Sequence, residues 1–177
     1  MKKYLLSVLT LLSLATACTP LDEKIDPAIQ SKVPSEAQGQ WMWGAFSRDD
    51  FKNYNGTISG KPFEQCYVLE LAPNGEFEQY VINSASSYSC KTEAFSYFKG
   101  KVKFNEEEES FTLTQTYGNF RGYYSCYPNK NFRRDAKASE LKTTKYYYSY
   151  QTSGNRRLMV LRATPNDSQG MFLTYSE

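Results

Sequence analysis

The stretch that decides the fold is residues 63–83, which read FEQCYVLELAPNGEFEQYVIN. Two runs rich in Tyr, Val, Leu and Phe flank Pro73-Asn74-Gly75, where proline presets φ and Asn-Gly tolerates positive φ. Aromatic and β-branched residues favour strands, because their side chains suit a pleated, half-buried surface. The stretch therefore predicts a β-hairpin, with strands over 63–71 and 76–83.

The same rhythm of strands and turns continues on both sides of this hairpin. Further strands are expected at residues 39–46, 95–104, 111–117, 120–126, 143–151, 157–163 and 170–175. Nine strands joined mostly by short turns predict an all-β domain, built as an antiparallel up-and-down meander. We expect the meander to close into a barrel of eight to nine strands, because closure removes exposed sheet edges. The alternative is a β-sandwich built from the same meander.

The N-terminus has the three parts of a secretory signal over residues 1–17. Two lysines precede an uncharged apolar run, and the small residues Ala15-Thr16-Ala17 follow it. The apolar run is shorter than the roughly 20 residues that a membrane-spanning helix needs. The next residue is Cys18, and residues 14–18 resemble the lipobox of bacterial lipoproteins. The resemblance implies cleavage before Cys18 and lipid attachment to its thiol; the alternative is an ordinary secretory signal cut near Ala17.

The lipoprotein resemblance divides the chain into three parts. Residues 1–17 are the signal peptide, residues 18–38 a lipidated flexible tether, and residues 39–177 the β-domain. The expected location is the cell envelope, anchored in the outer membrane on its periplasmic face or at the cell surface. Thr19 supports the outer membrane, because an aspartate there would mark retention in the inner membrane of proteobacteria.

Charge and composition exclude several classes of function. The 21 basic residues fall to 19 without the signal peptide, against 19 acidic residues, so nothing favours a nucleic-acid partner. Histidine is absent, which removes the commonest general base and transition-metal ligand. We therefore expect no enzyme, no cofactor and no metal site. The four glutamates 106–109 predict a solvated hairpin tip, because consecutive carboxylates do not form a calcium cage.

The expected domain opens with Gly39-Gln40-Trp41, which matches the Gly-x-Trp that opens lipocalins. The chain resembles the lipocalin-like (calycin) barrels of bacterial lipoproteins. In that family the tryptophan closes one barrel end against an arginine from a late strand. The resemblance gives this role to Trp41, with Arg162 as the expected partner and Arg157 as the alternative. The family's Thr-Asp-Tyr motif is only echoed by Thr144-Lys145-Tyr146, which lacks the acid.

Three cysteines remain once Cys18 carries lipid, and export makes one disulfide expected. Counting strands places Cys66 and Cys90 at one barrel end and Cys126 at the other. A strand of about eight residues spans roughly 25 Å, far more than the roughly 4–7 Å between the Cα atoms of a disulfide. The sequence therefore predicts the pair Cys66–Cys90, whereas a miscounted strand would favour Cys90–Cys126.

Tyrosines supply the candidate ligand contacts, because their faces stack and their hydroxyls form hydrogen bonds. The candidates are Tyr67, Tyr123, Tyr146, Tyr148 and Tyr150, and the alternative is that they pack in the core. The expected function is a membrane-anchored lipoprotein that binds a small apolar or amphipathic ligand, with a saccharide also considered. The alternative is a cell-envelope interaction or inhibitor module with a filled core. Basic residues over 130–137 predict a solvated loop or a contact with an anionic partner.

Overall fold

The computed structural model describes residues 26–55 and 65–176, so the expected signal peptide and Cys18 lie outside the described residues. The strands are β1 (Gly39–Trp43), β2 (Cys66–Leu71), β3 (Glu76–Ser87), β4 (Cys90–Asn105), β5 (Ser110–Tyr124), β6 (Phe132–Asp135), β7 (Thr143–Ser153), β8 (Arg156–Arg162) and β9 (Met171–Ser176). The helices are α1 (Arg48–Asn53) and two 3-10 turns, η1 (Pro128–Lys130) and η2 (Ala138–Glu140). Over the described ranges, no helix has the length and apolar character needed to cross a bilayer.

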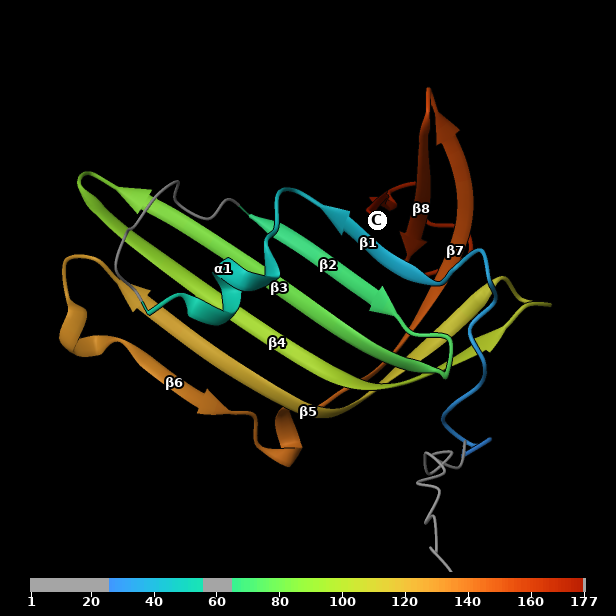
Figure 1. Cartoon of the computed structure of the whole chain (residues 1–177), viewed down its shortest axis with the longest axis horizontal. Coiled ribbons are helices and arrows are strands. Elements are labelled where there is room, and N and C mark those ends of the chain that lie inside the picture. Colours follow the sequence, from blue (N-terminus) through green and yellow to red (C-terminus); the bar gives the residue numbers. More distant parts are fainter. Residues whose placement is uncertain (1–25, 56–64, 177) are drawn as a thin grey trace, which may run out of the picture.

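The strands form one antiparallel sheet whose hydrogen bonds close into a ring (Figure 1). The order is β4-β3-β2-β1-β9-β8-β7-β5-β6, and an additional pairing joins β4 to β5. Eight strands therefore form a closed strand ring, while β6 pairs with β5 outside it. The predicted all-β up-and-down meander is confirmed. The β-sandwich alternative is not found, because all nine strands of the described ranges belong to one sheet.

The predicted hairpin around Pro73-Asn74-Gly75 is confirmed as β2 and β3, which pair from Cys66↔Ile82 to Leu71↔Phe77. Gly75 has a φ of 87°, a conformation that side-chain-bearing residues rarely adopt. A Cβ atom on Gly75 would also collide with the backbone oxygen of Ser31. Glycine is therefore required here twice over, by the turn and by the N-terminal segment that lies against it.

Residues 26–38 were expected to belong to a flexible tether, and this expectation does not hold for most of them. Val33 and Ala37 are only 3% and 0% exposed within the main core. The Ser31 N–H donates to the Val102 carbonyl at 3.0 Å, and the Phe104 N–H donates to Ser31 Oγ at 2.9 Å. The segment therefore packs on the strand ring, and the ordered domain begins well before Gly39.

Alternation along the strands gives the sheet two apolar faces. In β2, Tyr67 and Leu69 point into the strand ring, whereas Cys66 and Val68 belong to a second cluster on the outer face. Helix α1 covers this outer cluster through Phe51, as Figure 1 shows over β3 and β4. Sequence reasoning missed this short helix inside a polar loop, although its N-cap, Ser47, accepts a hydrogen bond from the Asp50 N–H.

The predicted Cys66–Cys90 disulfide is wrong, because the structure joins Cys90 to Cys126 with a Cα separation of 5.4 Å. The error came from the turn expected at Gly118-Asn119. Strand β5 runs straight through these residues, where Asn119 pairs with Tyr97 of β4. One long β4–β5 hairpin therefore returns Cys126 to the start of β4. Cys66 remains a buried free thiol on the outer face.

Removing the Cys90–Cys126 bridge will destabilise the domain. The two residues are 36 positions apart, and a cross-link over a loop of that length lowers the entropy of the unfolded chain by the equivalent of about 3 to 4 kcal/mol, which is regained when the bridge is removed. We expect Cys90→Ser and Cys126→Ser to lower the free energy of unfolding in urea by this amount, with the two-hydrogen mass deficit lost. Cys66→Ala is the control and keeps the deficit; a Cys90→Ser chain that retained it would disprove the pairing.

The thiol of Cys66 will resist alkylation in the folded chain. Burial raises its pKa to about 11, only partly offset by a backbone hydrogen bond at Ile82. In a chain of residues 18–177 carrying Cys18→Ser, Cys66 is the one cysteine outside the disulfide. Iodoacetamide at pH 8 should therefore label the folded chain at least about 100-fold more slowly than the urea-unfolded chain.

The same raised pKa has a consequence for stability against pH. As pH rises from the ordinary thiol pKa towards about 11, the unfolded chain loses the Cys66 proton before the folded chain does. The contribution of Cys66 to stability is therefore complete below that window and is lost across it. In urea titrations at increasing pH, the difference in unfolding free energy between the parent chain and Cys66→Ala should therefore shrink across this window. A difference that does not change with pH would contradict this expectation.

Candidate functional site

A cavity of about 610 Å³ opens between the inner face of β3, β4 and β5 and the segment from η2 into β7. Its lining residues come from five elements and the short link between η2 and β7. They are Gln79, Val81, Phe98, Leu113, Gln115, Phe120, Ser139, Glu140, Lys142, Thr144 and Tyr146. The apolar residues come mainly from the strands, whereas the charged residues come from the irregular segment, so the cavity is amphipathic.

The apolar wall is built by alternation along neighbouring strands. Phe98 of β4 and Phe120 of β5 meet edge to face, with ring centroids 5.5 Å apart. Gly118 lies opposite Phe98, and a Cβ atom there would be only 2.7 Å from the Phe98 ring. Gly118, which was expected in a turn, therefore leaves room for the Phe98 ring to lie over strand β5.

The polar edge is a chain of hydrogen bonds that starts at Tyr67. Gln79 Nε2 donates to the Tyr67 hydroxyl at 2.8 Å, and Gln115 Nε2 donates to Gln79 Oε1 at 3.4 Å. The backbone N–H of Lys142 then donates to Gln115 Oε1 at 2.9 Å. Burial raises the pKa of the Tyr67 hydroxyl, so Tyr67 stays neutral.

An ion pair ties η2 to the strand β6 beside the cavity. Arg134 donates to both carboxylate oxygens of Glu140, at 2.7 and 2.8 Å, and the Lys137 N–H adds a third bond at 2.8 Å. These bonds lower the pKa of Glu140 to about 2. The Arg134 guanidinium also lies 4.8 Å from the centre of the Phe120 ring. The basic residues over 130–137 therefore include a structural cation, Arg134, which lies in strand β6 and not in the expected loop.

The structure separates the five candidate tyrosines. Tyr146 lines the cavity, and Tyr67 heads its polar chain. Tyr148 and Tyr150 lie farther along β7, where Tyr148 packs on Phe111 and Tyr150 on Trp41. Tyr123 lies on the outer face, where its hydroxyl donates to the Tyr54 carbonyl. Sequence reasoning missed Gln79 and Gln115, although strand alternation places them on the same face as Phe77 and Leu113.

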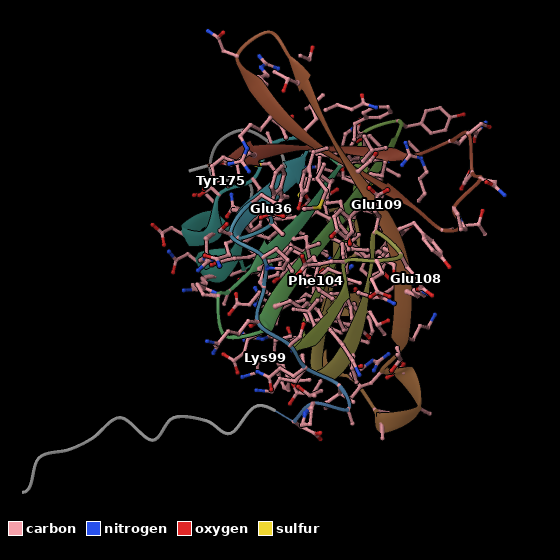
Figure 2. The ribbon with its side chains drawn as sticks, turned by 90° about the vertical axis from the view of Figure 1, so that its right-hand side faces the viewer. Glu36, Lys99, Phe104, Glu108, Glu109 and Tyr175 are labelled. Carbon is pink, nitrogen blue, oxygen red and sulfur yellow. A yellow bond between two sulfur atoms is a disulfide. The ribbon has the colours of Figure 1, made fainter. Side chains whose placement is uncertain are left out.

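Trp41 belongs to the core of the strand ring, where it is fully buried and donates from Nε1 to the Ala37 carbonyl at 2.7 Å. Its cationic partner is Arg157, whose Cζ lies 5.4 Å from the Trp41 ring centroid and 4.8 Å from that of Tyr175. Arg157 also donates to the Glu36 carbonyl at 2.7 Å. Figure 2 shows Glu36 and Tyr175 near each other.

The predicted partner Arg162 is therefore wrong. Arg162 and Arg157 both lie on β8, but they are an odd number of residues apart and so point to opposite faces. The inward residues Met159 and Leu161 share the parity of Arg157. Arg162 instead donates to Ser149 Oγ at 3.0 Å.

The acidic run 106–109 forms the tip of the β4–β5 hairpin beside β7, where Figure 2 labels Glu108 and Glu109. Glu108 pairs with Lys145 at 2.5 Å, and the Glu109 carbonyl accepts from the Tyr148 N–H. Across residues 26–55 and 65–176, no group of three or more Cys, Asp or Glu side chains is arranged to hold a metal ion.

Comparison with known proteins identifies no relative. No protein-family model matches the chain, and no curated protein or solved structure matches it. The residues of the cavity and the N-terminal sequence are therefore the features that point to a function.

Replacing Arg157 will test which arginine packs against Trp41. Arg157→Ala removes the contacts with two aromatic rings and one hydrogen bond, so we expect a loss of about 1 to 2 kcal/mol in unfolding free energy. Arg162→Ala is the matched control and should cost less than about 1 kcal/mol. Equal losses, measured by urea unfolding followed through tryptophan fluorescence, would contradict the assignment.

Proposed function

We propose that the chain is an exported bacterial lipoprotein, anchored through Cys18, that holds a small amphipathic ligand in the cavity beside β3, β4 and β5. The observation that carries the proposal is the division of the lining into an apolar wall and a polar edge. The volume of about 610 Å³ lies within the range of roughly 300–1,000 Å³ that is usual for small-molecule sites.

The anchoring part of the proposal is supported by sequence alone. Residues 14–18 resemble a lipobox, and a basic and apolar segment precedes them. Attachment at the outer membrane, on its periplasmic face or at the cell surface, belongs to the same proposal. An acyl-chain label that Cys18→Ser abolishes would support the anchor.

In this proposal the protein binds its ligand and does not catalyse a reaction. Histidine is absent from the sequence, which removes the commonest general base. The free thiol Cys66 lies on the outer face, away from the cavity, and burial raises its pKa, which makes it a poor nucleophile. The carboxylate that lines the cavity, Glu140, is held in an ion pair with Arg134.

An interaction or inhibitor module is the second candidate. Bulky side chains such as Trp41, Phe111 and Met159 fill the strand ring away from the cavity. Several large apolar side chains are exposed, among them Trp43 at 47% and Phe172 at 49%. These residues favour a role in which a surface, not the cavity, meets a partner protein.

Filling the cavity will distinguish the two candidates. Thr144 lines it, whereas the neighbouring Thr143 on the same strand points to the other face and is exposed. The probe is N-phenyl-1-naphthylamine, a neutral compound that fluoresces in apolar sites. In the mature chain with Cys18→Ser, Thr144→Trp should weaken probe binding by about tenfold or more, equivalent to at least 1.4 kcal/mol, and Thr143→Trp should not.

Native mass spectrometry of the same chains from the periplasm provides the second readout. A small molecule that copurifies with the parent chain and with Thr143→Trp, but not with Thr144→Trp, supports binding in the cavity. Failure of the parent chain to bind the probe, together with a clean apo mass, would rule out the proposed function and leave the interaction module.

A further inference from the structure

The charges on the cavity lining do not cancel. Two charged residues line it, Glu140 and Lys142. Glu140 is neutralised by Arg134, which contacts both of its oxygens. Lys142 has no carboxylate within ion-pair distance in the part of the chain that the structure describes. The edge of the cavity therefore carries one uncompensated positive charge.

The backbone, not the ammonium group, fixes Lys142 in place. Its N–H donates to Gln115 Oε1 at 2.9 Å, and its carbonyl accepts from the Gln115 N–H at 3.0 Å. These two bonds hold the residue against β5 whatever its side chain does. The ammonium group is left available for a ligand, and its substitution need not disturb the local fold.

Along the polar edge, the hydrogen-bond acceptors are engaged within the chain, whereas several donors are not. Each amide or carboxylate acceptor already receives a hydrogen bond from the chain itself: Gln79 Oε1 accepts from Gln115, Gln115 Oε1 accepts from Lys142, and both Glu140 oxygens accept from Arg134. Donors remain. The Lys142 ammonium and the hydroxyls of Ser139 and Thr144 donate to no group within the described ranges. The edge therefore suits a ligand that brings acceptors.

The remaining wall specifies the rest of the ligand. Val81, Phe98 and Phe120 present apolar surface from three adjacent strands. Burying apolar surface here contributes to affinity, but it does not select a head group. The head group is selected at the other edge, where a charge-assisted hydrogen bond is worth more than a neutral one.

We infer that the ligand is an amphipathic anion, with its oxyanion head at Lys142 and its apolar body against Val81, Phe98 and Phe120. This inference rests on the proposed function and names the ligand class. A cationic head would meet the Lys142 charge. A neutral sugar could exchange hydrogen bonds with this edge, but it would leave Lys142 without a counter-charge.

A series of probes with one chain length tests the head group. Decanoate, decanol and decylammonium compete with N-phenyl-1-naphthylamine for the mature chain carrying Cys18→Ser. We expect decanoate to displace the probe about tenfold more effectively than decanol, with decylammonium the weakest. Added salt should reduce the advantage of decanoate over decanol. That advantage comes from attraction to an exposed charge, which salt screens.

The matched variants are Lys142→Gln and Lys130→Gln. Both remove one positive charge, but Lys130 lies in η1 and does not line the cavity. Lys142→Gln should reduce the affinity for decanoate about tenfold and leave decanol and the neutral probe unchanged, whereas Lys130→Gln should change none of them. Urea unfolding of each variant confirms that the fold is retained.

The outcomes separate this inference from the proposed function. Equal displacement by decanoate and decanol, or an unchanged decanoate affinity in Lys142→Gln, would overturn the anionic ligand while the cavity still binds the neutral probe. Loss of binding of all probes in Thr144→Trp, with the decanoate preference intact in the parent chain, would support both. Failure of the parent chain to bind any probe would overturn the proposed function itself.

Discussion

Closure of the sheet is the constraint on which the rest of the structure depends. Because β4 pairs with β5 and β1 pairs with β9, every strand of the ring must turn alternate side chains inward. The strands β3, β4 and β5 are much longer than β1 and β2, so they extend past the filled core. There one face is covered by α1, and the other is left for the cavity between β5 and η2.

Local sequence patterns correctly predicted the turns and strands that are determined by residues close together in the sequence. The turn at Pro73-Asn74-Gly75 and the strand expected at residues 95–104 are examples, and both are found. Gly118-Asn119 uses the same residue types for another reason, because Gly118 makes room for the ring of Phe98 across the strand pair. That distinction depends on a partner strand, which local chemistry does not reveal. The wrong disulfide followed directly from this one misplaced turn.

The candidate site was predictable to a similar degree. The parity of the strands is sufficient to place Gln79 and Gln115 with Leu113 on one face, and a parity count from Met159 would have selected Arg157 over Arg162. Glu140 and Lys142 lie in an irregular segment, so no periodicity places them. They reach the cavity through pairings with Arg134 and Gln115, which only the folded chain reveals.

The packed N-terminal segment sets how far the domain can travel. The segment is anchored by Gln30, whose side chain donates to the Asn74 carbonyl, and by the buried Val33. If Cys18 carries the lipid as proposed, residues 18–25 can span at most about 28 Å. The domain is then confined to a thin layer above the bilayer. Its effective concentration at the membrane surface is correspondingly high, and ligands that partition there are the ones that it meets most often.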